Sequence, residues 1–201
     1  MKPGSVQIAS LLESLTHEDK AVAKAAVDAL VRIGPDSPDV QNALEALFHE
    51  LASDKRWPVA YALAQLNAPP VACLDILIDA LGDGDADIRW ATVVVLSRLG
   101  KTDDRIFPRL ADLLITGGSV QKRMAVYCLR YLGLKRKVVV QALHQTLQDP
   151  DPMVRVAVVN TLAEHPPAGR ETMTLLRYVL LQDANEKVRH AAEFALKRLG
   201  R

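Results

Sequence analysis

The chain has 201 residues, with 25 lysines and arginines against 24 aspartates and glutamates, and 49% of its residues are hydrophobic. This mixture is typical of a globular protein and excludes an intrinsically disordered chain. No apolar run is long enough to span a membrane or to act as a secretory signal, so neither is expected. Cys73 and Cys128 form neither a disulfide framework nor a zinc pattern, and we therefore expect a cytoplasmic protein.

Residues that commonly end helices, namely glycine, asparagine or proline, recur along the chain with a period of 33 or 34 residues. The six occurrences are Gly34, Asn67, Gly100, Gly133, Pro166 and Gly200. Four positions before them stand Leu30, Leu63, Leu96, Leu129, Leu162 and Leu196. Nineteen positions before them stand Leu15, Phe48, Leu81, Leu114, Leu147 and Leu181. An apolar pattern that repeats in register predicts a repeat protein whose neighbouring units share one core.

Each repeat has the pattern of two helices joined by a short turn. Residues 71–81 carry apolar residues at three- and four-residue steps, residues 82–85 interrupt them, and residues 86–99 form a second helical pattern. We therefore predict an all-α fold, a right-handed α-solenoid of six two-helix repeats that forms a single domain over residues 1–201. The repeats are expected to span approximately residues 1–34, 35–67, 68–100, 101–133, 134–166 and 167–201.

The second helices share a motif of an acidic residue, then an apolar residue and arginine, then alanine, leucine and a closing Leu-Gly. It is clearest in DADIRWATVVVLSRLG from Asp85 and recurs in DPMVRVAVVNTL from Asp151 and NEKVRHAAEFALKRLG from Asn185. This motif resembles the HEAT-like repeat family, in the short bacterial form that is also known from phycobilisome lyase subunits. The resemblance covers essentially the whole chain, and it implies that the second helices line the concave side of the solenoid.

A basic residue recurs at one position of the motif, in Arg56, Arg89, Lys122, Arg155 and Arg189. The resemblance implies a structural role, in which each basic residue pairs with an acidic residue of a nearby repeat. The acidic residues placed for this role are Asp54, Asp87, Asp151 and Asp183. Contact with nucleic acid is the alternative interpretation of the same position.

No constellation of catalytic residues is apparent. HEAT-like deoxyhypusine hydroxylases bind iron through His-Glu pairs on their second helices, and no such pair stands at the matching positions here. The pairs His17-Glu18 and His49-Glu50 lie at the ends of first helices, where we interpret them as solvated. Phosphate-binding loops, nucleophile elbows and metal-binding clusters are also absent from the sequence. We therefore expect a protein that is not an enzyme, with no cofactor and no metal.

A helical wheel places an unusual set of residues opposite the apolar face of the second helices. In residues 86–101 this set comprises Trp90, Val94, Ser97 and Lys101, although a purely structural surface helix should be charged there. Trp, Tyr and Arg are the residue types enriched at binding hot spots. The predicted partner-binding residues across the repeats are Trp57, Tyr61, Trp90, Val94, Arg123, Tyr127, Arg130, Asn160, His190 and Phe194. The alternative is that neighbouring helices cover the aromatic rings.

The charges divide unevenly between the two halves of the sequence. Residues 1–100 hold 8 basic and 14 acidic residues, whereas residues 101–201 hold 17 basic and 10 acidic residues. A basic cluster is expected around Lys122, Arg123, Arg130, Lys135, Arg136 and Lys137. Such an asymmetry can orient a charged partner or promote head-to-tail self-association.

The sequence favours a non-catalytic scaffold or adaptor that binds a protein or peptide in its concave groove. One alternative is an accessory subunit of a chromophore-handling enzyme, similar to phycobilisome lyase subunits, in which a tetrapyrrole stacks on Trp57 and Trp90. The other alternative is a nucleic-acid-binding protein, which the near-neutral total charge disfavours.

Overall fold

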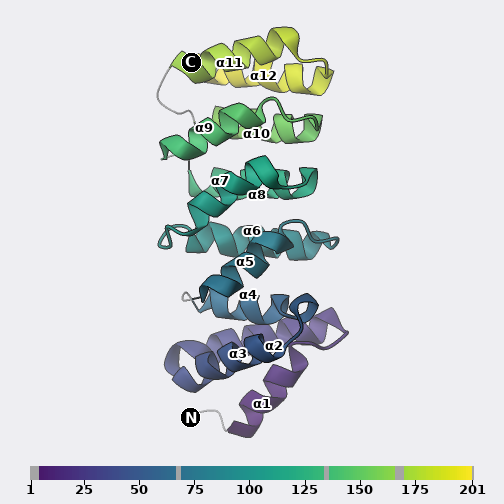
Figure 1. Ribbon diagram of the computed structural model, residues 1–201, viewed down its shortest axis with the longest axis vertical. Coiled ribbons are helices and arrows are strands. Elements are labelled where there is room, and N and C mark those ends of the chain that lie inside the picture. Colours follow the sequence, from purple (N-terminus) through teal and green to yellow (C-terminus); the bar gives the residue numbers. More distant parts are fainter. Residues whose placement is uncertain (1–4, 67–68, 134–135, 166–169, 201) are drawn as a thin grey trace. The chain divides into compact units, whose positions relative to one another are not determined.

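The computed structural model describes residues 5–66, 69–133, 136–165 and 170–200. Within these ranges the chain forms twelve α-helices and two short 3-10 helices, and no strand (Figure 1). The helices are α1 Ser5–Ser14, α2 Lys20–Ile33, α3 Pro38–Glu50, α4 Trp57–Gln65, α5 Val71–Ala80, α6 Ala86–Leu99, α7 Ile106–Thr116, α8 Ser119–Leu132, α9 Lys137–Thr146, α10 Pro152–Glu164, α11 Arg170–Gln182 and α12 Glu186–Leu199. The prediction of an all-α solenoid of two-helix repeats is confirmed. Among the described helices, none combines the length and apolar character that crossing a bilayer requires.

The chain divides into two compact units, Met1–Ala80 and Leu81–Arg201. In the first unit α2 packs against α1 and α4, while α4 also packs against α3 and α5. In the second unit the second helices of the repeats, α6, α8, α10 and α12, pack against one another in succession. The first helices α7 and α11 cover this layer by packing on α8 and α12 respectively. The single domain predicted from the sequence stays a prediction.

The second helices begin at a recurring cap and several end at a recurring glycine. Asp85 and Asp151 each accept a hydrogen bond from the backbone N–H two residues later, at 2.9 and 2.7 Å, which satisfies a free donor of the first turn. Gly100 ends α6 where the Leu132 side chain approaches so closely that an added Cβ would lie 2.9 Å from it. The closing glycine thus lets successive second helices pack tightly.

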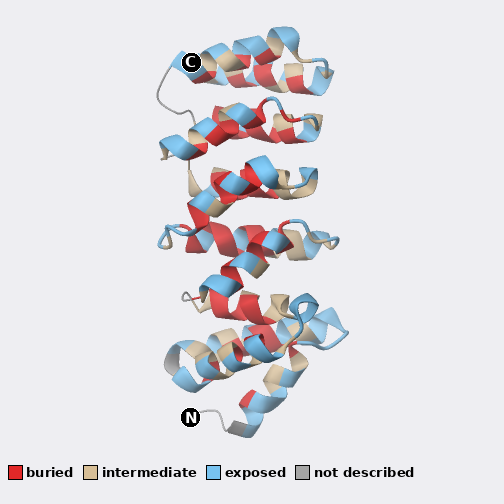
Figure 2. Ribbon diagram, viewed as in Figure 1, coloured by how far each residue is buried: buried red, intermediate tan, exposed pale blue. Residues whose placement is uncertain are grey.

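The repeating leucines form the core, and Figure 2 shows the buried residues concentrated where helices face one another. Leu96, Leu129 and Leu162 are each fully buried. The position nineteen residues before the closing residue is also buried in five repeats, from Leu15 to Leu147. In the sixth repeat this prediction is wrong, because the side chain of Leu181 is 73% exposed.

The reason for the exposure of Leu181 is one extra residue between the core of α11 and the following turn. α9 ends at Thr146, whereas α11 continues through Leu181 to Gln182. The half-buried Leu180 therefore takes the place that Leu147 has in the preceding repeat. A one-residue insertion turns the side chains that follow it by about 100° around the helix axis.

Helix α12 is charged at a position that is apolar in the helices before it. Val93, Val126 and Val159 are fully buried in α6, α8 and α10, and Glu193 replaces them in α12. Glu193 and Lys197 form an ion pair with a distance of 2.6 Å between Nζ and Oε1. Helix α12 thus has a polar face at the position where α6, α8 and α10 have buried valines.

Replacing this ion pair by the residues of α10, in the variant Glu193→Val/Lys197→Ala, is expected to promote association. The variant uncovers an apolar strip that the other second helices bury, and such strips mark interaction sites. Size-exclusion chromatography with light scattering should show a mass that rises with concentration. The matched variant Asp112→Val/Thr116→Ala, at the same helical spacing on exposed positions of α7, should stay at the parent mass. If both variants associate to the same extent, the Glu193–Lys197 pair is not what prevents association through α12.

Candidate interaction surface

The second unit presents a row of mostly uncharged residues along its second helices. Trp90 and Val94 on α6 are 45% and 62% exposed, and Phe194 on α12 is 67% exposed. Between them α8 contributes half-buried side chains and α10 an exposed one. We call this set the outer row: Trp90, Val94, Arg123, Tyr127, Asn160, His190 and Phe194. Because α6, α8, α10 and α12 are successive neighbours, the outer row runs across four adjacent helices.

An aromatic stack joins two helices of this row. The rings of Trp90 and Tyr127 have centroids 5.3 Å apart and planes inclined by 19°. Offset stacking of this kind is favourable beyond the burial of apolar area. Tyr127 thereby holds the indole of Trp90 in one orientation while almost half of the Trp90 side chain stays in solvent. The stack is thus already formed in the chain by itself.

A second stack occurs in the first unit. The rings of Trp57 and Tyr61, both half-buried, have centroids 5.0 Å apart and planes inclined by 22°. The Tyr61 hydroxyl accepts a hydrogen bond of 3.0 Å from the Gln65 amide. The two tryptophans thus recur at one repeat position, each stacked on a tyrosine. The structure brings together the predicted residues of each unit, and their continuation from one unit to the other stays a prediction.

The prediction of an exposed side chain is wrong for one residue of this face. Ser97 lies on the Trp90 side of the helical wheel, yet it is only 6% exposed. The neighbouring helix α8 covers that side of α6: the Cys128 sulfur lies 4.0 Å from the Val93 carbonyl oxygen, and both residues are fully buried. A short side chain beside a packed helix is covered by it, which a helical wheel cannot show.

The two arginines predicted to grip the partner differ in their surroundings. Arg130 forms two hydrogen bonds to the carboxylate of Glu164, so its charge is already compensated. Arg123 makes no such pair, and its Nε is buried without a hydrogen-bond partner among the residues that the structure describes. The pKa of Asp151 is lowered chiefly by the Met153 backbone N–H and, to a smaller extent, by the nearby charge of Arg123. Arg123 is therefore the stronger candidate for contact with an acidic or carbonyl group.

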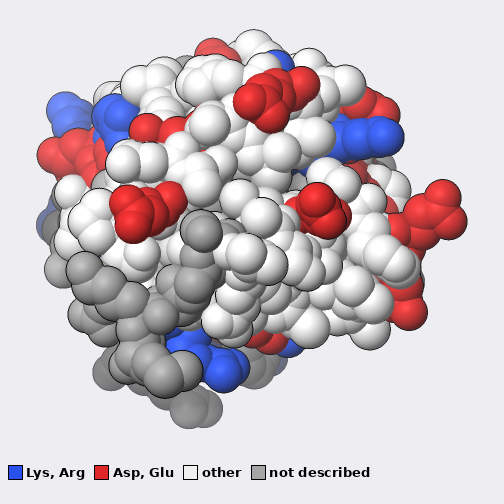
Figure 3. All heavy atoms as spheres, turned by 90° about the horizontal axis from the view of Figure 1, so that it is seen from below, with Lys and Arg blue, Asp and Glu red and all other residues white. Residues whose placement is uncertain are grey.

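Three of the six residues of the basic cluster predicted from the sequence, Lys122, Arg130 and Arg136, pair with carboxylates. Lys122 bonds Asp149 at 2.8 Å, and Arg136 pairs with Asp104 while lying over the ring of Phe107. Lys135 lies outside the described residues. Figure 3 views the first unit from its α1 side, which does not include this cluster, and shows scattered charges of both signs separated by uncharged surface. Ion pairing removes much of the free positive charge that contact with phosphate groups requires.

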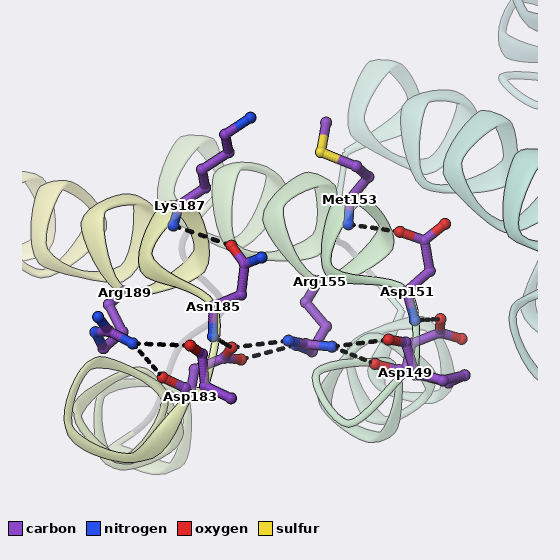
Figure 4. A network of polar contacts seen from close by, with 10 residues as sticks. Asp149, Asp151, Met153, Arg155, Asp183, Asn185, Lys187 and Arg189 are labelled. Carbon is purple, nitrogen blue, oxygen red and sulfur yellow. Dashed lines mark hydrogen bonds and ion pairs between the residues drawn. The ribbon is translucent and has the colours of Figure 1, made fainter.

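The recurring basic residues form a ladder in the second unit (Figure 4). Arg155 donates two hydrogen bonds of 2.7 Å to the carboxylate of Asp183 and one of 2.7 Å to the carbonyl of Asp149. Arg189 donates to the Asp183 carbonyl at 2.7 Å. The guanidinium of Arg155 thus links the turn before its own helix to the turn of the next repeat.

The ladder uses different carboxylates from those predicted, with the exception of Asp183. Lys122 pairs with Asp149, while Asp151 caps α10 through the backbone N–H of Met153 at 2.7 Å. Asp54 and Asp87 make no ion pair among the described residues. A carboxylate two residues before the cap lies in the turn itself, within reach of the preceding repeat, whereas the cap residue is committed to its own helix.

Other groups show little sign of chemical reactivity. Burial raises the pKa of the Cys73 and Cys128 thiols to about 12, so both stay protonated at neutral pH. The His17 ring accepts a hydrogen bond of 2.9 Å from the Asp19 backbone and so closes the turn before α2. Over the described ranges, no group of three or more His, Cys, Asp or Glu side chains is placed to hold a metal.

Residues 108–197 match a family model described as HEAT repeats. This part of the chain is thus similar to HEAT repeats. This match confirms the resemblance drawn from the second-helix motif. No curated protein matches the chain in sequence.

Several solved structures of repeat proteins resemble this chain in fold at low sequence identity. A designed armadillo repeat protein in complex with the peptide (KR)4 is 14% identical, covers 96% of this chain and 99% of its own, and gives a TM-score of 0.50. The complex of CpcE and CpcF of phycocyanin lyase from Nostoc sp. PCC7120 is 20% identical over 96% and 99%, with a TM-score of 0.38. Human deoxyhypusine hydroxylase is 16% identical over 98% and 86%, with a TM-score of 0.40. These likenesses concern the fold alone.

Proposed function

We propose that this protein is a non-catalytic scaffold that binds an extended segment of a partner protein across the outer row. The observation that carries the proposal is the exposure of Trp90, Val94 and Phe194, which are 45%, 62% and 67% exposed. A surface helix that serves structure alone fills such positions with charged residues. Exposed apolar residues that recur on successive helices are typical of an interaction surface.

The spacing of the helices sets the length of the segment. Adjacent packed helices lie about 8–10 Å apart, so the three steps from α6 to α12 span about 24–30 Å. A chain in the extended polyproline II conformation rises about 3.1 Å per residue and completes a turn every three residues, so about eight to ten residues would cross the row. Apolar residues should recur about three positions apart in this segment, one for each helix that it crosses.

The charges of the outer row favour an acidic residue in the bound segment. Arg123 forms no ion pair among the described residues, whereas the guanidinium of Arg130 is occupied by Glu164. An acidic side chain next to the apolar residue that contacts Tyr127 would compensate the charge of the half-buried Arg123. Charge-assisted hydrogen bonds of this kind are about twice as strong as neutral ones.

Peptides selected from a random twelve-residue display library against the folded protein should bind the outer row. We expect Trp90→Ala and Phe194→Ala each to weaken the selected peptides by about thirtyfold, the loss that follows truncation of a hot-spot aromatic. Isothermal calorimetry measures the affinity. Circular dichroism should show unchanged melting for Phe194→Ala, whose side chain is 67% exposed, and a retained helical fold for Trp90→Ala, which loses only the stack with Tyr127. In a Trp57→Phe background, peptide binding should also protect Trp90 fluorescence from iodide.

The matched controls are Ile115→Ala and Leu181→Ala, which truncate side chains that are 62% and 73% exposed on first helices. Both variants should bind the selected peptides with the parent affinity. If the controls weaken binding as much as Trp90→Ala does, the binding surface is on the first helices and the proposal is wrong. Selected peptides without spaced apolar residues would contradict the extended geometry.

A further inference from the structure

The layer of first helices opens between α9 and α11. α7 packs against α9, but α9 has no comparable packing against α11. A surface pocket with a volume of about 270 Å³ occupies this opening. Its walls come from the end of α9, from α11 and from one residue of α10, and they include His144, Leu147, Gln148, Tyr178, Val179 and Gln182.

The pocket is uncharged although ionisable groups line it. Arg155 and Asp183 lie at its wall and compensate each other through two hydrogen bonds of 2.7 Å. His144 shares a hydrogen bond of 2.9 Å with the Thr172 hydroxyl, and burial lowers the pKa of its ring against the opposing charge of Glu171. Burial thus disfavours the charged form of the His144 ring. An occupant with a net charge would find no counterion here, so a neutral one fits best.

The volume limits the size of the occupant. Sites for drug-sized ligands measure about 300–1,000 Å³, so the pocket is too small for a large cofactor and suits a single side chain. Its lining also suits an apolar side chain, because Leu147 and Val179 supply apolar contact at its base. Tyr178, which is 63% exposed, adds an aromatic wall at the rim.

Two amides stand beside this apolar base. Gln148 and Gln182 both line the pocket, are both exposed, and each directly precedes the aspartate of its turn, Asp149 or Asp183. A primary amide both donates and accepts hydrogen bonds, as a peptide group does. One amide from each of two repeats can therefore bond the backbone on either side of an inserted residue.

We propose that the pocket between α9 and α11 is a second docking site, which takes one uncharged leucine- or phenylalanine-sized side chain from an extended partner segment. Leu147, Val179 and Tyr178 contact the side chain, and the amides of Gln148 and Gln182 bond the adjoining backbone. The site lies on the first-helix side of the second unit, whereas the outer row lies on second helices. The two sites can thus hold different segments of one partner.

Amide-capped single residues test the site directly. N-acetyl-leucinamide and N-acetyl-phenylalaninamide should shift the NMR signals of Tyr178 and of the Gln148 and Gln182 side-chain amides. The dissociation constants should be about millimolar, which is the affinity expected of so few atoms. N-acetyl-lysinamide should bind with an affinity at least tenfold lower, measured from the same signals. The Trp90→Ala variant, altered only in the outer row, should bind both uncharged probes as the parent does.

A matched pair of variants separates the pocket from a general surface effect. Tyr178→Lys should weaken both uncharged probes at least tenfold, whereas Leu181→Lys adds the same charge on the same helix outside the pocket lining and should change nothing. Equal weakening by both variants would overturn the proposal. So would shifts that map to the outer row, equal binding of the lysine probe, or a dimer of the chain that Tyr178→Lys disrupts, since a second copy would then be the occupant.

Discussion

Replacing Leu129 by alanine is expected to lower the free energy of unfolding by about 2–5 kcal/mol, the usual cost of truncating a buried leucine. Leu129 is fully buried in α8, and α8 packs against α6, α7 and α10 at once. A cavity there loosens contacts on three sides, so the damage should extend beyond one repeat. Urea denaturation followed by circular dichroism should show a lower midpoint, with a shift of the melting temperature by several degrees.

The control for this prediction is Leu181→Ala. Sequence periodicity places Leu181 in the core, yet it is 73% exposed, and a surface truncation of this kind usually changes stability by less than about 0.5 kcal/mol. Comparing the two variants therefore tests whether Leu181 is exposed, as in the structure, or buried, as the sequence period predicts. If Leu181→Ala were as damaging as Leu129→Ala, the extra residue of the sixth repeat would have to lie elsewhere.

The repeat architecture could be predicted because each unit restates the same physical constraint. Leu96, Leu129 and Leu162 occupy one position, and all three are buried for the same reason: a helix pair cannot cover its own apolar face. The end of the helix at Gly100 could also be predicted, because glycine commonly ends helices. The close approach of the Leu132 side chain to Gly100 is visible only in the structure.

The register of the last repeat could not be predicted by counting back from Gly200. The insertion lies between Leu180 and Asp183, and the apolar sequence around it fits either register. The 34-residue spacing from Pro166 to Gly200 was the available signal, but it does not say on which side of the turn the extra residue lies. The pocket beside Tyr178 was missed with it, because a gap between helices leaves no mark on a helical wheel.

The candidate site was predictable in its aromatic part and less so in its charged part. The faces of helices follow from a period of 3.6 residues, so Trp90, Val94 and Phe194 were placed on the exposed side. The pairing of Arg130 with Glu164 joins residues 34 positions apart on neighbouring helices, which is one repeat plus one residue. Many carboxylates lie at similar separations, and only their geometry selects one.

Removing the charge of Asp183 in the variant Asp183→Asn is expected to destabilise the second unit by about 3–5 kcal/mol, the cost of leaving a buried ion without its partner. The side chains of Arg155 and Asp183 are only 14% and 7% exposed, so solvent cannot compensate the guanidinium. The double variant Arg155→Met/Asp183→Leu should recover most of the loss, because it removes both charges together. The control Glu193→Gln breaks the exposed pair with Lys197 and should leave the melting temperature unchanged.

The same pair should make the protein sensitive to acid. The Arg155 guanidinium lowers the pKa of Asp183 below its ordinary value of 3.8, so the folded state binds this proton less readily than the unfolded state does. The stabilisation is therefore complete above about pH 4 to 5 and is lost as the pH falls through the lowered pKa of the folded state. Thermal melts of the parent between pH 7 and pH 2 should show this loss, and the difference between parent and Asp183→Asn should shrink over the acid part of the range. A difference that stays constant down to pH 2 would show that the charge of Asp183 does not support the ladder.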